Sequence, residues 1–174
     1  MITTMRPGAG EYSAAFAGYV ARIGDDEPIM SVLVDQLDQV VARLRRIPEA
    51  RGDYRYAPDK WSIKEMVGHL IDTERVFAYR ALRIARGDRT PLPSFDDQAY
   101  VAGSRAGERT LASLTSEWGD TRRATISLFR NLPAEAWHQR GTASDQPISV
   151  RALAYVVAGH LRHHLQTLEE RYTA

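Results

Sequence analysis

Residues Ser149–Leu168, SVRALAYVVAGHLRHHLQTL, form one long segment in which apolar residues recur at steps of three and four. This spacing is the period of a helix that buries one face. Ser149 has the hydroxyl group typical of a helix N-cap. His160 and His164 occupy consecutive positions of the apolar face. The segment therefore predicts a helix from Ser149 to about Tyr172 with two imidazoles on its buried side.

Three earlier segments repeat the same helical period. In the second of them, Ser62 and Glu65 have the spacing of a capping box, in which each side chain bonds the backbone N–H of the other residue. No sustained period-two run indicates a strand. The sequence thus predicts an all-α fold, a four-helix bundle, whose first three helices are Pro28–Arg46, Ser62–Arg86 and Thr110–Asn131.

The connections between these segments predict the topology. The link between the second and third helices has about 23 residues, which is long enough to run the length of a bundle. We therefore expect an up-down-down-up order, with two helical hairpins joined by this crossover. A short helix around Tyr12–Tyr19 precedes the bundle, and residues 1–174 are predicted to form a single domain.

Composition excludes several classes of site and partner. The 174 residues contain 23 Lys and Arg, 22 Asp and Glu, and no cysteine. A disulfide framework, a thiolate zinc site and a cysteine nucleophile are therefore excluded, and the balanced charge argues against a nucleic-acid surface. Met1–Gly10 lacks the apolar core of a secretory signal, and no apolar run reaches the ~18 residues that span a bilayer. We expect a cytoplasmic protein with no nucleic-acid or membrane partner.

Three histidines are predicted to face one another inside the bundle. His160 and His164 follow the apolar stripe, while His69 lies about 80° from the stripe of the second helix. Their depths coincide if the second and fourth helices run antiparallel. Buried neutral imidazoles need partners for their ring nitrogens, and a divalent metal satisfies one nitrogen of each ring. Two core histidines satisfied by other side chains or water are the alternative interpretation.

Three histidines with an open position form a ligand set of catalytic zinc, and nickel, iron or manganese also accept such ligands. A metal at such a site lowers the pKa of a bound water. The pattern therefore favours metal-dependent chemistry on a small-molecule substrate. A bundle with a structural metal, and a plain bundle without one, remain open alternatives.

Two stretches of the chain resemble the histidine motifs of the DinB/YfiT-like superfamily, over a region from about residue 11 to 172. The first motif comprises Tyr56–Glu65, YAPDKWSIKE, with Gly68–Arg75, GHLIDTER, and the second is Gly159–Gln166, GHLRHHLQ. The resemblance is strongest to the YfiT-like branch of metal-dependent hydrolases. It implies an up-down-down-up bundle, often a homodimer, and a divalent metal held by His69, His160 and His164.

The resemblance also leaves the reaction open. Members with known activity include thiol-dependent S-transferases and isomerases, which use a small cofactor thiol. A hydrolase, a thiol-dependent enzyme and a non-catalytic, stress-associated metal-binding protein are therefore the functions to compare.

Other polar residues are expected to have structural roles, or a role in the site that depends on the shape of the pocket. We interpret Glu74 as the partner of an arginine, and Arg80 as a site for a substrate anion if the pocket is long. His163 is expected at the helix boundary and His138 in solvent. Glu65 is expected to be the cap partner, and Asp72 to pair with Arg75 at the surface. Trp61 is expected to form a hydrophobic staple over Met66. Asp96, Asp97 and Tyr100 are expected in a loop that either covers the site or is solvated.

Overall fold

The computed structural model describes residues 5–172, so the outermost ends of the predicted domain, 1–4 and 173–174, lie outside it. Four long helices form the bundle, and each begins and ends close to its predicted bounds. The fourth continues as a π-helix to Tyr172, where its end was predicted. Two further helices are short: α1 precedes the bundle, and α4 lies in the crossover between the second and third bundle helices. The helices are α1 Ala14–Val20, α2 Ile29–Arg45, α3 Ile63–Ala85, α4 Asp97–Ser104, α5 Leu111–Arg130 and α6 Val150–Thr167, followed by the π-helix at Leu168–Tyr172.

Side-chain caps fix the starts of three of the bundle helices, α3, α5 and α6. The Ser62 hydroxyl accepts the N–H of Glu65, and the Glu65 carboxylate accepts the N–H of Ser62, so the predicted capping box is present at α3. Thr110 caps α5 and Ser149 caps α6 through their hydroxyl oxygens. These bonds satisfy N–H groups that have no partner within the helix.

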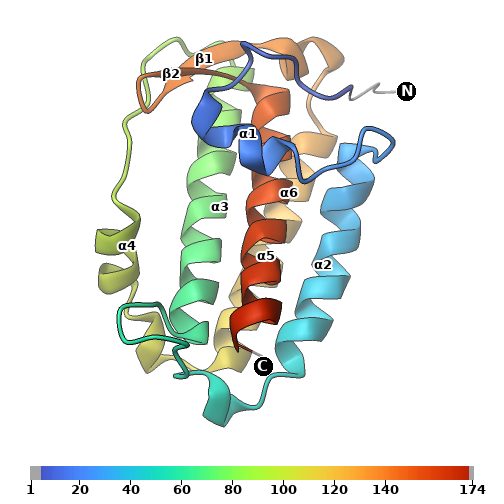
Figure 1. Cartoon of the computed structure of the whole chain (residues 1–174). Helices are drawn as coiled ribbons and strands as arrows, with labels where there is room; N and C mark the ends of the chain where they lie inside the picture. The colour runs from blue at the N-terminus through green and yellow to red at the C-terminus, as the bar shows by residue number, and fades with distance from the viewer. Residues whose placement is uncertain (1–4, 173–174) are drawn as a thin grey trace.

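The helix directions follow the predicted up-down-down-up order. In Figure 1, α2 and α6 descend while α3 and α5 ascend, and the crossover with α4 returns the chain along the outside of the bundle. The predicted hairpins need correction. Both α2 and α3 pack mainly on α5 and α6, so α2 and α3 face each other across the diagonal. The long α2–α3 connection, with a short 3-10 turn at Glu49–Arg51, permits this crossing.

A small β-hairpin, which the sequence analysis did not predict, closes the end of the bundle where α6 begins. Strands β1 (Arg140–Ala143) and β2 (Gln146–Ser149) pair antiparallel. Their turn residues Ser144 and Asp145 both have positive φ angles, the geometry of a type I′ turn. Strands of four residues are too short to produce a period-two pattern, and Ser-Asp is not a typical residue pair for this turn.

The hairpin also holds the crossover. Leu92 donates its N–H to Thr142 O and accepts the N–H of Ser144, at 2.9 Å each. This pairing fixes the segment after α3 against the hairpin turn. The loop that leads to α4 is therefore attached to the bundle before it reaches the site described below.

Helix α6 is the most enclosed element of the fold. Nearly every residue from Val150 to Leu161 is buried, because α1 covers the face that α2 and α3 leave open. The approach is closest at Gly159, where a Cβ atom would lie 2.0 Å from Tyr19 O. A glycine is therefore required at this position for α1 to rest on α6.

A buried ion pair connects three helices. Arg122 on α5 donates from Nε and Nη2 to the two carboxylate oxygens of Glu74 on α3, at 2.7 and 2.8 Å, and from Nη1 to Gln36 on α2. Arg122 is fully buried and Glu74 is 5 % exposed. The predicted arginine partner of Glu74 is thereby confirmed, and the charges are compensated in the core.

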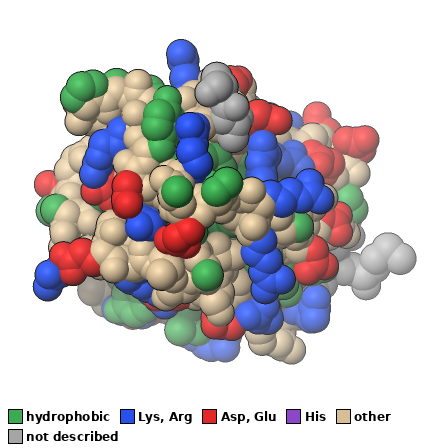
Figure 2. Space-filling model, turned by 90° about the horizontal axis from the view of Figure 1, so that it is seen from below, with side chains coloured by type: hydrophobic (Ala, Val, Ile, Leu, Met, Phe, Trp, Pro, Cys, Tyr) green, Lys and Arg blue, Asp and Glu red, His purple; other side chains and the backbone are tan. Residues whose placement is uncertain are grey.

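The surface shows no single dominant charge on the face seen from below. There, basic and acidic side chains are interspersed with small apolar patches (Figure 2). Within residues 5–172, none of the helices combines the length and apolar character that crossing a bilayer requires.

We predict that Gly159→Ala destabilises the protein by about 2–3 kcal/mol, because the added methyl group collides with the Tyr19 carbonyl and lifts α1. Gly18→Ala is the matched control. Gly18 lies in α1, and a methyl group added there would have no atom within 4 Å of it, so alanine should leave stability unchanged or raise it by up to about 1 kcal/mol. Urea denaturation measures both, and equal stability of the two variants would contradict the close approach.

Candidate metal centre

Three imidazoles converge between α3 and α6. His69 lies in the second turn of α3, and His160 and His164 lie near the end of α6. The Nε2 atom of His160 is 3.1 Å from the Nε2 atom of His69 and 3.1 Å from that of His164. The antiparallel packing of the two helices brings together the three residues that the sequence analysis proposed as ligands.

Hydrogen bonds alone do not satisfy this cluster. A neutral imidazole has one N–H and one lone pair, so His160 Nε2 can form one good hydrogen bond but has two neighbours at 3.1 Å. Tetrahedral coordination at Zn–N distances of about 2.0–2.1 Å places ligand nitrogens about 3.3 Å apart. The observed separations fit three lone pairs directed at one cation, and in residues 5–172 these histidines form a group able to hold a metal.

The surroundings keep the imidazoles neutral. Burial lowers the pKa of His69 to about 4. Burial, with the neighbouring His69 as a further cause, lowers the pKa of His164 to about 3. His160, only 6 % exposed, has its pKa well below the ordinary value for the same reason. Neutral rings retain the lone pairs that metal coordination requires.

Polar and aromatic side chains hold the rings from outside. His69 Nδ1 lies 3.3 Å from the Thr73 hydroxyl and 3.9 Å from a carboxylate oxygen of Asp97. The Thr73 hydroxyl oxygen can accept a hydrogen bond from Nδ1–H, and this tautomer leaves the Nε2 lone pair directed at the centre. Tyr19 packs edge-on against His160, with ring centroids 5.3 Å apart.

Trp61 forms one wall of the centre. Its ring centroid is 4.6 Å from that of His69 and 6.4 Å from that of His164. Its Nε1 donates to Gln98 in α4 at 3.0 Å. Trp61 was predicted to form a hydrophobic staple, and its contact with His69 was not predicted. The position of a tryptophan before a helix does not show in which direction its side chain points.

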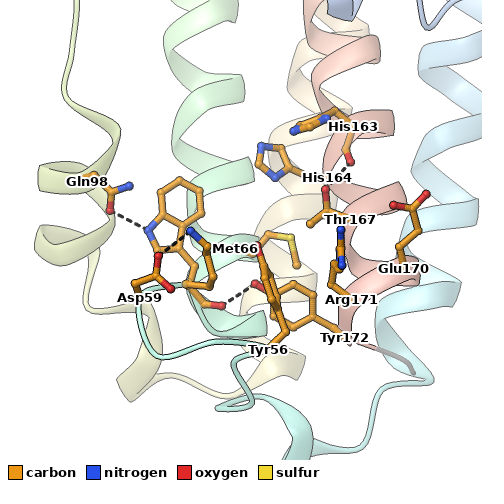
Figure 3. A pocket seen from close by; sticks show the side chains of 12 residues that line it. Tyr56, Asp59, Met66, Gln98, His163, His164, Thr167, Glu170, Arg171 and Tyr172 are labelled. Atoms are coloured by element: carbon orange, nitrogen blue, oxygen red, sulfur yellow. Dashed lines mark hydrogen bonds and ion pairs between the residues drawn. The ribbon is translucent and has the colours of Figure 1, made fainter.

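Two cavities flank the imidazoles. A wide one of about 460 Å³ lies on the His164 side, and it is lined by Trp61, Gln98 and residues of the α6 end (Figure 3). A smaller one of about 140 Å³ lies on the His160 side, and Asp97 lines it. The site therefore has room for a small molecule on both sides.

The remaining predicted residues have the following positions. His163 contacts Arg22 through Nδ1, lines the wide cavity and lies outside the three-histidine group. His138 is exposed. Asp72 lies 3.8 Å from Arg75 at the half-buried edge of α3. Of the loop residues, Asp97 reaches His69, whereas Asp96 caps α4 and Tyr100 is exposed.

Acidification should unfold the metal-free protein. Histidine in the unfolded chain titrates near pH 6.5, whereas His69 and His164 in the folded chain stay neutral down to about pH 4 and about pH 3. Between these values the unfolded chain binds more protons, so stability is full above pH 6.5 and decreases as the pH falls toward 4. Each buried imidazole contributes on the order of 1 kcal/mol per pH unit.

Urea denaturation of chelator-treated protein at several pH values measures this slope. His164→Gln should make the slope shallower by about one proton, while His138→Gln, at an exposed position, should leave it unchanged. An identical slope in His164→Gln and the unmodified protein would contradict the neutral, buried state of this ring.

Comparisons with known proteins give a matching family and similar folds. A family profile described as "DinB superfamily" matches residues 33–168. Among solved structures, YfiT from Bacillus subtilis, described as a probable metal-dependent hydrolase with an unusual four-helix bundle topology, aligns with a TM-score of 0.70 at 14 % identity, over 82 % of each chain.

A mycothiol-dependent maleylpyruvate isomerase aligns with a TM-score of 0.69 at 12 % identity, over 86 % of this chain and 62 % of the isomerase. At these identities the structural matches show a shared fold. A search of curated protein sequences gives no match.

Proposed function

This chain belongs to the DinB superfamily, and from that membership together with its converging imidazoles we propose that it is a metal-dependent enzyme acting on a small molecule. His69, His160 and His164 are the proposed ligands of one divalent metal. The observation that carries the proposal is the pair of 3.1 Å separations between their Nε2 atoms. Zinc is the proposed metal, and nickel, iron and manganese also bind imidazole.

The residues around the centre have separate proposed roles. A divalent metal supplies Lewis acidity and lowers the pKa of a bound water or thiol. The three imidazoles hold that ion, and Thr73 fixes the His69 ring by accepting a hydrogen bond from its Nδ1–H. Trp61 covers the His69 side and excludes water from it.

Asp97 is the proposed proton acceptor of the site. Burial, and to a smaller extent Asp96, raises the pKa of its carboxyl group. It lines the small cavity and lies 3.9 Å from His69 Nδ1. A carboxylate at this position can take a proton from water or from a substrate that enters beside His160. Hydrolysis is the reaction that this arrangement supports best.

Thiol-dependent transfer or isomerisation is the second candidate. The chain has no cysteine, so a thiol would have to come from a cofactor. The wide, partly polar cavity beside His164 has the volume to receive one. Likeness in fold to the mycothiol-dependent isomerase supports this candidate. A homodimer and a cytoplasmic location stay predictions from the sequence.

Metal binding tests the shared premise of both candidates. We predict about one divalent metal ion per chain in the purified protein, and loss of it in His69→Gln and His160→Gln, because either change removes a lone pair from the centre. Elemental analysis measures the ratio. His138→Gln is the control, since His138 is an exposed histidine outside the group.

The fluorescence of Trp61 gives a second measurement of metal binding. Added Co²⁺ or Cu²⁺ should quench the fluorescence of this indole, whose ring lies 4.6 Å from His69, and Trp61→Phe should abolish that part of the signal. A metal ratio near zero in the unmodified protein, with no quenching, would refute the metal centre.

Activity assays separate the two reactions. Ester and amide substrates should be cleaved by the metal-loaded protein without a thiol if it is a hydrolase. Turnover that appears only when a low-molecular-weight thiol is added would favour transfer or isomerisation instead. Asp97→Asn should lower hydrolysis by about 10²-fold or more while metal content stays unchanged.

A further inference from the structure

Arg80 on α3 is a buried arginine that lacks a carboxylate partner among residues 5–172. Only 3 % of it is exposed. Its Nη2 donates to Pro93 O at 2.7 Å and to the Ser144 hydroxyl at 3.1 Å, both neutral acceptors. Arg122, which is also buried, instead binds both carboxylate oxygens of Glu74. Hydrogen bonds to neutral acceptors compensate only part of the hydration that a buried cation loses, and an opposite charge would compensate more of it.

The guanidinium group lines the small cavity that adjoins His160. Arg80 and Ser144 form the part near the hairpin turn, whereas Thr73 and Asp97 line the part near His69. The volume of about 140 Å³ corresponds to about four to five water molecules at liquid density. A small organic molecule fills such a space, and a nucleotide or peptide does not fit in it.

Helix geometry directs Arg80 toward the imidazoles. Its Cα lies about 16 Å from that of His69 along α3, but long side chains on a helix lean toward its N-terminus, which here is the direction of His69. The Phe77 ring contacts both groups, with the Arg80 guanidinium 5.9 Å and the His160 ring 6.0 Å from its centroid. One small molecule can therefore touch the guanidinium and reach the three-imidazole centre.

We propose that Arg80 binds the carboxylate of a small substrate whose other end lies at the imidazole centre. This proposal adds a substrate class, a small carboxylic acid, to the proposed function, and it rests on that function. The planar guanidinium fork matches a carboxylate, and it is the sole arginine or lysine among the residues that line this cavity.

The charges of the cavity also define the orientation of the bound molecule. Asp97, near His69, repels a negative group. The carboxylate is thus directed to the Arg80 end, and the uncharged, reactive part of the molecule to the centre. A phosphate dianion is disfavoured, because it loses more hydration than a carboxylate on entering the cavity and one guanidinium group neutralises only half of its charge.

Ligand-induced stabilisation tests the proposal with propionate as the probe. Propionate should raise the melting temperature of the full chain in a concentration-dependent way, and the neutral isostere propionamide should not. Arg80→Gln should weaken propionate binding about tenfold or more, and Arg80→Lys by less, because lysine keeps the charge but loses the fork. Arg89→Gln is the control, since Arg89 is exposed and bonds the backbone of β1.

The measurement is made on both the as-purified and the chelator-treated protein. Arg80-dependent binding in chelator-treated protein is expected whether or not the metal centre exists, so failure of the proposed function and failure of this inference are distinguishable. Nitrogen NMR of the Arg80 Nε–H, which should shift with propionate, gives a readout that does not depend on melting.

Three results would overturn the proposal: no stabilisation by propionate, equal propionate binding by the Arg80 variants and the unmodified protein, or tighter binding of inorganic phosphate than of propionate. If Arg80→Gln does not fold, Arg80→Lys carries the comparison. Its expected weaker binding is then measured against Arg89→Gln.

Discussion

The antiparallel contact between α3 and α6 is the constraint on which the site depends. It places the second turn of α3 beside the last turns of α6, and so brings His69 to the level of His160 and His164. In a parallel arrangement, the rise of about 1.5 Å per residue would leave His69 about 6–12 Å away in height from His160 and His164. The crossover that makes the helices antiparallel also supplies Asp97 and Gln98, which contact His69 and Trp61. Topology and site chemistry are therefore linked through one connection.

The enclosure of α6 explains why its histidines are neutral. Because α1 covers the face opposite the bundle at Gly159, His160 is only 6 % exposed, and it borders open space at the small cavity. The same shielding would make a lone imidazole expensive to bury, since its nitrogens need partners. Because each of the three rings directs a lone pair at the same small volume, one cation bound there would be the shared partner that these nitrogens need.

Sequence patterns were sufficient to predict the four long helices, the caps of α3 and α6 and the three histidines that meet. These features depend on local spacing, as in the Ser62–Glu65 capping box, or on one long-range inference, the helix order. The hairpin at Ser144 and the ring position of Trp61 were not predictable in this way. Both depend on tertiary contacts that leave no periodic signal, and the diagonal placement of α2 and α3 depends on packing choices among all four helices.

The two buried arginines illustrate how a fold and a function place different demands on the same side chain. Arg122 has its charge compensated by Glu74 within the core. Arg80 has neutral acceptors only, among the residues described, and it borders open space. A bundle that needed only stability would favour an apolar residue at that position.

The diagonal arrangement of consecutive helices has a consequence for how the chain folds. In a bundle of adjacent hairpins, two neighbouring helices can dock locally and serve as a nucleus. Here the apolar face of α2 is covered only when α5 packs on it, and that of α3 only when α5 or α6 does. Because the native contacts between bundle helices therefore have a long sequence separation, we expect folding to be slower than in an up-and-down bundle of equal length.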